Sequence, residues 1–200
     1  MASLQSRPQP PSIGDRAAAD LQYIRQAMER GAKFTAVPGL GGTAMGVVGL
    51  GAAFAGAIQP TAERWLLVWL GAAAVACAIG VVAISRKASH AGVNLTGHVA
   101  RSFAVAVSAP IVAGAGITYA LWSTRTFTAM PAVWLLLYGA GVLAGGALSV
   151  PVVRIVGVIF MLLGFAAALT PPALGNVWLG IGFGAIQLAG GIYIVRNHGG

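Results

Sequence analysis

The residues Gly39 to Ala44 read GLGGTA, which fits the G-x-G-x-x-A pattern of a dinucleotide-binding loop. In such a loop the glycines let the backbone approach a pyrophosphate, and an acidic residue about 20 positions later binds the ribose. Glu63 lies at about that distance. The pattern also requires a strand before the loop and a helix packed on a soluble sheet after it. Here the residues that follow are apolar on every helical face, so we interpret the match as accidental.

Acid–base, metal and nucleophilic chemistry have few candidate side chains in this sequence. The four acidic residues all lie outside the long apolar segments: Asp15, Asp20, Glu29 and Glu63. The three histidines do so too: His90, His98 and His198. Proton relays, paired-aspartate proteolysis and haem ligation inside a membrane are therefore disfavoured, and the serines and threonines there lack a nearby base.

We predict a non-enzymatic protein with no catalytic, cofactor-binding or metal-binding residue. The histidines could in principle meet around a metal ion. Without cysteine or acidic companions, however, they are more typical of solvated loop residues.

Gln187 is the only amide in the middle of an apolar segment, where it stands between FGAI and LAGG. An amide in hydrocarbon needs a hydrogen-bond partner, so its side chain should face other helices. Two interpretations remain open: Gln187 binds a substrate, or it joins two helices. We favour the second, because hydrogen bonds of this kind are common between membrane helices.

The composition indicates that a membrane positions these residues. Of the 200 residues, 58% are hydrophobic and 8% are charged, whereas soluble domains carry about 25% charged residues. The runs without a charged residue are 34–62, 65–85, 102–124, 126–153 and 155–195. A helix needs about 20 apolar residues to cross a bilayer, so the first four runs each supply one span. The last run, broken at Thr170-Pro171-Pro172, supplies two.

The predicted fold class is therefore an all-α, polytopic transmembrane bundle of six spans within residues 34–200. The spans are expected near 36–58, 65–85, 102–122, 131–149, 151–169 and 176–195. Ten lysines and arginines fall on the side that holds the termini, and only Arg64 and Arg125 fall on the other. Because positive residues favour the cytoplasmic side, we predict that both termini are cytoplasmic. This placement accounts for the net charge of +8 without a nucleic-acid partner.

Two segments precede the first span. Residues 1–14 are polar and rich in proline, and we expect a flexible tail. Residues 15–33 place apolar side chains at helical spacing on one face, with most charged side chains away from it. We predict a short basic amphipathic helix that lies at the inner membrane surface. Docking onto a partner protein is the alternative.

Small residues recur at helical spacing in the first, fourth and sixth spans, in part as Gly-x-x-x-Gly. The glycines on these faces are Gly42, Gly46, Gly49, Gly56, Gly141, Gly145, Gly180 and Gly184. In lipid, such faces let two helices approach closely and drive their association. We predict helix packing at these residues. Packing inside one bundle is favoured over packing between copies of the chain, and both remain open.

The even-numbered spans each begin with proline and tryptophan and end near arginine. Their tryptophans are Trp65, Trp134 and Trp178. Because tryptophan prefers the membrane–water interface, we predict that these three residues are interface anchors. The shared pattern could also mark three duplicated hairpins. We favour the shared physical preference, since the connecting loops differ in length.

Three stretches carry a resemblance to known proteins: LQYIRQAMERGAKFTAVPGLGG, WLLLYGAGVLAGGALSVPVVR and MLLGFAAAL. They resemble a family of small bacterial six-span membrane proteins, and the likeness covers most of residues 20–200. That family has no assigned activity, cofactor or catalytic residues. The resemblance therefore implies a place in the bacterial inner membrane, and it assigns no functional residue.

Two functions fit these observations. The first is a non-enzymatic integral protein of the inner membrane that packs with copies of itself or as an accessory component of a larger membrane complex. The small-residue faces and the sparse chemistry favour it. The alternative is a small transporter or channel for a neutral or lipophilic solute, which Gln187 and the glycine and proline breaks favour.

Overall fold

The computed structural model describes residues 14, 20–24, 38–90 and 97–198. The chain divides into two compact units, Met1–Lys33 and Phe34–Gly200. In the first unit the residues from Asp20 to Ile24 are helical. The rest of the predicted amphipathic helix, and the predicted tail apart from Gly14, lie outside the described residues.

The second unit confirms the prediction of an all-helical chain with six apolar helices. Its described residues include no strand, and six of its described helices are long and apolar enough to cross a membrane. The first five are α2 (Gly39–Ala57), α3 (Ala62–His90), α4 (His98–Ser123), α5 (Met130–Gly146, which follows a 3₁₀ turn at Phe127–Ala129) and α6 (Pro151–Leu169). The sixth, here called the last span, is Pro172–Asn197.

The last span is not a uniform α-helix. It consists of a 3₁₀ turn (Pro172–Leu174), α7 (Gly175–Leu179), a π-helical segment (Gly180–Ile186) and α8 (Gln187–His198). A π-helical segment is rare and is frequently found at functional sites. The glycines of the segment allow close contacts, since a Cβ added at Gly182 would lie 2.6 Å from Leu135 Cδ2. The sequence did not predict this segment.

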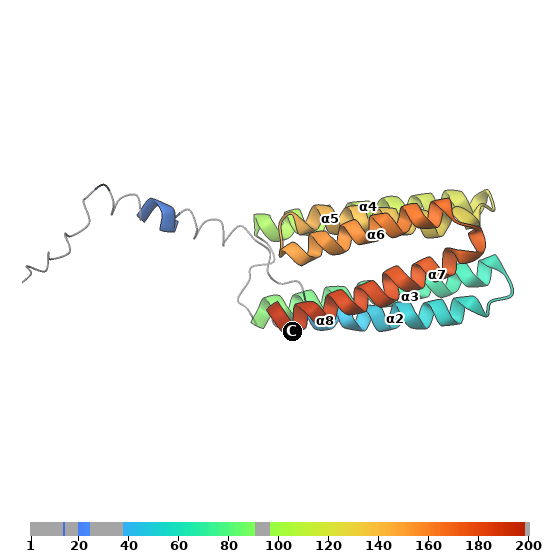
Figure 1. Ribbon diagram of the computed structural model, residues 1–200, viewed down its shortest axis with the longest axis horizontal. Helices are drawn as coiled ribbons and strands as arrows, with labels where there is room; N and C mark the ends of the chain where they lie inside the picture. The colour runs from blue at the N-terminus through green and yellow to red at the C-terminus, as the bar shows by residue number, and fades with distance from the viewer. Residues whose placement is uncertain (1–13, 15–19, 25–37, 91–96, 199–200) are drawn as a thin grey trace, which may run out of the picture. The chain divides into compact units, whose positions relative to one another are not determined.

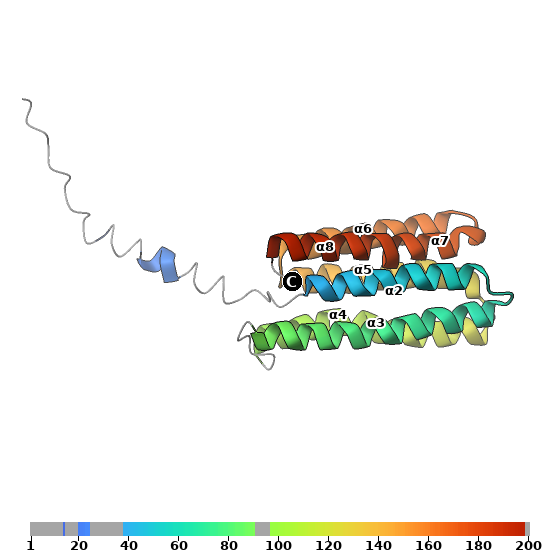
Figure 2. The same cartoon turned by 90° about the horizontal axis from the view of Figure 1, so that it is seen from below.

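The six spans form two layers of three helices (Figure 1). In one layer α2 lies between α3 and the last span, and in the other α5 lies between α4 and α6 (Figure 2). The first two hairpins, α2–α3 and α4–α5, therefore pack as pairs within a layer. The third does not, because α6 packs on α5 whereas the last span packs on α2. The three hairpins are thus not packed alike.

Helices α3 and α4 extend past the predicted spans where one ends and the next begins, and the last span starts before its predicted bound, at Pro172. The sequence places the second span at 65–85 and the third at 102–122, whereas α3 continues to His90 and α4 begins at His98. Arginine, lysine and alanine in these extensions favour helix. Most of their polar side chains are exposed, so these turns need no apolar surroundings.

The core lies between the layers and the lipid-facing surface is apolar. Leu135, Phe160 and Leu179 are fully buried. By contrast, Phe54 is 84% exposed and Leu169 is 86% exposed. Side chains of this size at the surface of a helical bundle are expected where lipid, rather than water, surrounds the protein.

Candidate functional site

Gln187 joins the two layers of the bundle. It begins α8, and its Oε1 accepts a hydrogen bond of 3.2 Å from the Tyr138 hydroxyl of α5. The Tyr138 ring packs against Phe160 and Phe183, with ring centroids 4.7 and 5.0 Å away. The amide that stood out in the sequence therefore faces the bundle, beside an aromatic cluster and next to the π-helical segment.

Asn176 makes a second polar connection, which the sequence analysis missed. Its Oδ1 accepts hydrogen bonds from Trp65 Nε1 at 2.9 Å and from Trp69 Nε1 at 3.0 Å. Its Nδ2 donates to the Ala53 carbonyl at 2.9 Å. One amide thus joins α2, α3 and α7. A search for amides at the ends of the spans, and not only in their middles, would have found it.

The three tryptophans that the sequence marked as interface anchors direct their N–H groups into the bundle. Trp65 stacks on Trp134, with centroids 5.6 Å apart and an interplanar angle of 2°. Trp134 Nε1 donates to Thr118 Oγ1, and Trp178 Nε1 donates to Thr170 Oγ1, each at 2.8 Å. With Trp65 bound to Asn176, all three indoles have protein partners. They brace neighbouring helices, and their role as interface anchors stays a prediction.

The glycine face of α2 lies against the last span. A Cβ added at Gly46 would lie 2.5 Å from the Leu188 backbone nitrogen, and one at Gly49 would collide with the Phe183 carbonyl oxygen. Real side-chain carbons are not found at such distances from backbone atoms. The two helices can therefore approach this closely only because both positions are glycine.

The other predicted packing glycines also lie at contacts inside the chain. Gly42 faces Gly191, Gly56 faces Asn176, Gly141 and Gly145 face α4, and Gly180 and Gly184 face α2. Close contacts between α5 and α6 use glycines outside the predicted set. A Cβ at Gly139 would lie 2.8 Å from the Gly157 carbonyl oxygen. These two glycines are not part of the Gly-x-x-x-Gly spacing that guided the search.

Three other glycines face away from the rest of the chain. A Cβ added at Gly51, Gly71 or Gly116 would meet no atom within 4 Å in the described part of the chain. Gly71 lies on α3 and Gly116 on α4, and both residues are exposed. The spans α3 and α4 are also the least buried. In the most apolar 18-residue stretch of each, 6% of the residues are buried inside the bundle, against 22–33% in the other described spans.

The charged residues of the bundle divide between its two ends. One end, where α3 finishes and α4 begins, holds Arg86, Lys87, Arg101, Arg154 and Arg196, and is called the basic end here. At the opposite end, Arg125 forms an ion pair with Glu63. Glu63 is the only acidic residue among those described in the second unit. The basic end therefore holds no acidic residue among the described residues of this unit.

The polar groups inside the described bundle hold helices together. Each buried side-chain nitrogen or oxygen among the described residues has a hydrogen-bond partner. In the same residues, no three His, Cys, Asp or Glu side chains gather closely enough to hold a metal ion. Comparisons with protein-family models, curated proteins and solved structures found no match to this chain. Its function is therefore inferred from its own contacts and charges.

Proposed function

We propose that this chain is a non-enzymatic, multi-pass protein of the bacterial inner membrane that associates with further copies of itself through the exposed faces of α3 and α4. The observation that carries the proposal is the open space beside Gly71 and Gly116 on the two least buried spans. The Gly-x-x-x-Gly faces of the other spans already have neighbours within the chain.

The two open glycines lie at similar depths. Gly71 follows the start of α3 at Ala62 by nine residues, and Gly116 precedes the end of α4 at Ser123 by seven. At a rise of about 1.5 Å per residue, both lie about 10–14 Å from the same end of the bundle. Because the spans alternate in direction, the two open glycines lie at the same level of the bundle.

Further small residues surround each open glycine. On α4 the exposed small residues at helical spacing are Ala109, Ala113, Gly116 and Ala120, and on α3 they are Gly71, Ala74 and Ala78. Helix association in lipid has no hydrophobic driving force, because lipid tails are as apolar as the helix surface. A second helix, however, gains van der Waals contact over the whole groove. This difference favours a second copy over lipid.

Cysteine cross-linking in native membranes tests the proposal directly. The chain has one cysteine, Cys77, which is exposed on α3. In a Cys77→Ser background, a cysteine at Ala78 should cross-link two copies, whereas one at Val158, exposed on α6, should not. A variant with Gly71→Leu and Gly116→Leu should lose the Ala78 cross-link. Equal cross-linking from both positions, or none from Ala78, would overturn the proposal.

A second function is supported by one specific observation. The π-helical segment lies directly before Gln187, in the middle of a span, where irregular backbone often borders a transport path. On this alternative the protein carries a neutral or lipophilic solute past the Tyr138–Gln187 pair. Gln187→Leu should then abolish flux without unfolding the protein.

A further inference from the structure

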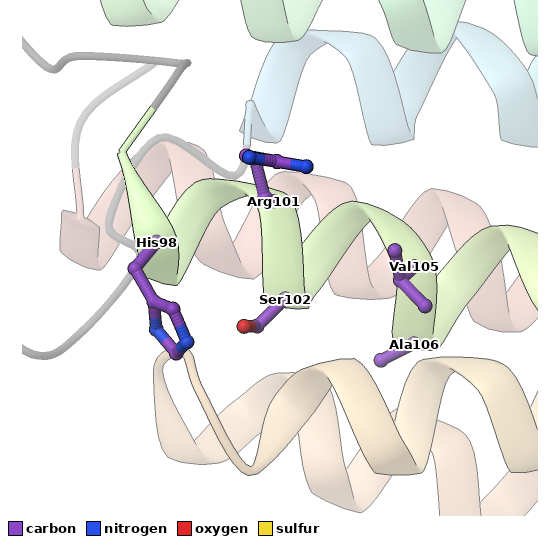
Figure 3. A pocket seen from close by; sticks show the side chains of 5 residues that line it. All are labelled: His98, Arg101, Ser102, Val105 and Ala106. Atoms are coloured by element: carbon purple, nitrogen blue, oxygen red, sulfur yellow. The ribbon is translucent and has the colours of Figure 1, made fainter.

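The start of α4 carries a shallow hollow that combines polar and apolar residues. It is lined by His98, Arg101, Ser102, Val105 and Ala106. Figure 3 shows His98, Ser102 and Ala106 following one side of α4, while Arg101 rises from the other side of the helix. The polar residues occupy the first two turns, and the apolar pair follows one turn further along the span.

The polar side chains of the hollow have no partner among the described residues. Ser89 and Thr118 bond back to the carbonyl four residues earlier, as hydroxyl side chains in helices commonly do. The half-buried Ser102 hydroxyl makes no such bond to a described residue, and the exposed Arg101 guanidinium makes no ion pair with one. Neither group is engaged by a described residue, so both can donate hydrogen bonds to a ligand.

The charge around the hollow favours an anion. Arg101 belongs to the basic end, together with Arg86 and Lys87 at the end of α3, Arg154 on α6 and Arg196 on α8. The acid of the described bundle, Glu63, is paired with Arg125 at the far end. An anion at the hollow would therefore meet the Arg101 guanidinium, at the basic end of the bundle, and no described carboxylate of the bundle. Arginine suits phosphate in particular, because its planar fork donates two parallel hydrogen bonds.

The length of the hollow along α4 fits the boundary of a bilayer, with the start of α4 placed at the membrane surface. From His98 to Ser102 the helix rises about 6 Å at 1.5 Å per residue. The headgroup region on each side of a bilayer is about 5–7 Å thick, since the whole bilayer exceeds its hydrocarbon core by about 10–15 Å. Val105 and Ala106 then fall where hydrocarbon begins. A polar upper part and an apolar lower part correspond to a headgroup and the first carbons of an acyl chain.

We propose that this hollow binds the phosphate of an anionic phospholipid, with Ser102, His98 and Arg101 at the headgroup and with Val105 and Ala106 against an acyl chain. Arg101 reaches the phosphate by laying its flexible stem along the helix, as arginines near span ends commonly do. The hollow lies at the start of α4, on the same side of the helix as Ala109, Ala113 and Gly116, which follow His98, Ser102 and Ala106 at the same spacing. Lipid binding there does not require self-association.

Native mass spectrometry of the purified full chain tests this site. The protein is released from mixed micelles that contain equal amounts of phosphatidylglycerol and phosphatidylcholine, and retained lipid is counted. We expect the wild type to retain phosphatidylglycerol preferentially. Arg101→Gln should weaken that retention about fivefold, the effect of one cation close to an anionic surface, and adding Ser102→Ala should weaken it further.

The matched control is Arg196→Gln, which removes one cation from the same end but not from the hollow. If it reduces retention as much as Arg101→Gln, only diffuse positive charge attracts the lipid, and the proposed site is wrong. Inorganic phosphate in millimolar excess should not displace the lipid, because it lacks the acyl chain. Displacement by phosphate would show an anion site without lipid specificity and would also overturn the proposal. Thermal unfolding of each variant shows that the fold is retained.

Discussion

The variants Gly46→Ala and Gly51→Ala test whether packing requires glycine at a position or only tolerates it there. Both residues lie on α2, five positions apart. A Cβ at Gly46 would lie 2.5 Å from Leu188 N and 2.6 Å from Leu188 Cα, whereas a Cβ at Gly51 would meet no described atom within 4 Å. Ordinary carbon contacts begin near 3.5 Å, so Gly46→Ala must push the last span away by about 1 Å.

The difference between the two variants isolates the packing cost. Each replacement gains about 1 kcal/mol of helix propensity, because both sites lie inside the same helix. Overpacking at a rigid contact costs about 1–3 kcal/mol, and backbone atoms cannot give way as a flexible side chain can. We therefore expect Gly46→Ala to be less stable than Gly51→Ala by about 1–3 kcal/mol, and Gly51→Ala to be at least as stable as the wild type.

Unfolding in mixed micelles by increasing fractions of sodium dodecyl sulfate measures this difference. Tryptophan fluorescence is a suitable signal, since Trp65, Trp69 and Trp134 lie at contacts between helices. Equal free energies of unfolding for the two variants would refute the packing argument. A loss of stability at Gly51 would refute it as well, because it would mean that this side of α2 is covered.

Three further variants separate the polar connections. Asn176→Leu leaves two indole N–H groups without their acceptor and should lower the free energy of unfolding by about 1–3 kcal/mol, because interhelical hydrogen bonds in membranes contribute about 0.6 kcal/mol on average and up to about 1.7. Tyr138→Phe removes a single bond of 3.2 Å and should cost under about 1 kcal/mol. Gln187→Leu should match Tyr138→Phe in its free energy of unfolding. If Gln187→Leu keeps that stability but abolishes solute flux in proteoliposomes, the transport alternative is correct and the packing proposal is wrong.

The number of spans could be predicted from composition because charge-free apolar runs long enough to cross a bilayer rarely occur outside membrane spans. The bounds were less predictable at α3 and α4. Their ends carry exposed charged residues, so helix propensity rather than hydropathy decides the last residue. The break at Thr170-Pro171 was predictable because proline cannot continue a helix. The π-helical segment was not, since its glycines fit an ordinary helix equally well until the contacts with α2 and α5 are known.

The partners of the polar residues could not be predicted in the same way. Gln187 was expected to face other helices because hydrocarbon offers an amide no partner, but nothing in the sequence pairs it with Tyr138. The same holds for the tryptophans. Their type predicts a place at the membrane interface, but it does not predict the stacking of Trp65 on Trp134 or their acceptors on other spans.

The glycines divide into two groups that sequence spacing alone does not separate. Gly46 and Gly71 both lie inside long apolar helices, yet Gly46 is buried against the last span and Gly71 faces open space. A glycine inside a contact follows from the fold, because a larger residue would separate the helices. An exposed glycine in a span weakens its helix and gains nothing from lipid. Selection for folding therefore accounts for Gly46 but not for Gly71 and Gly116, whose small size would instead serve a second helix at that face.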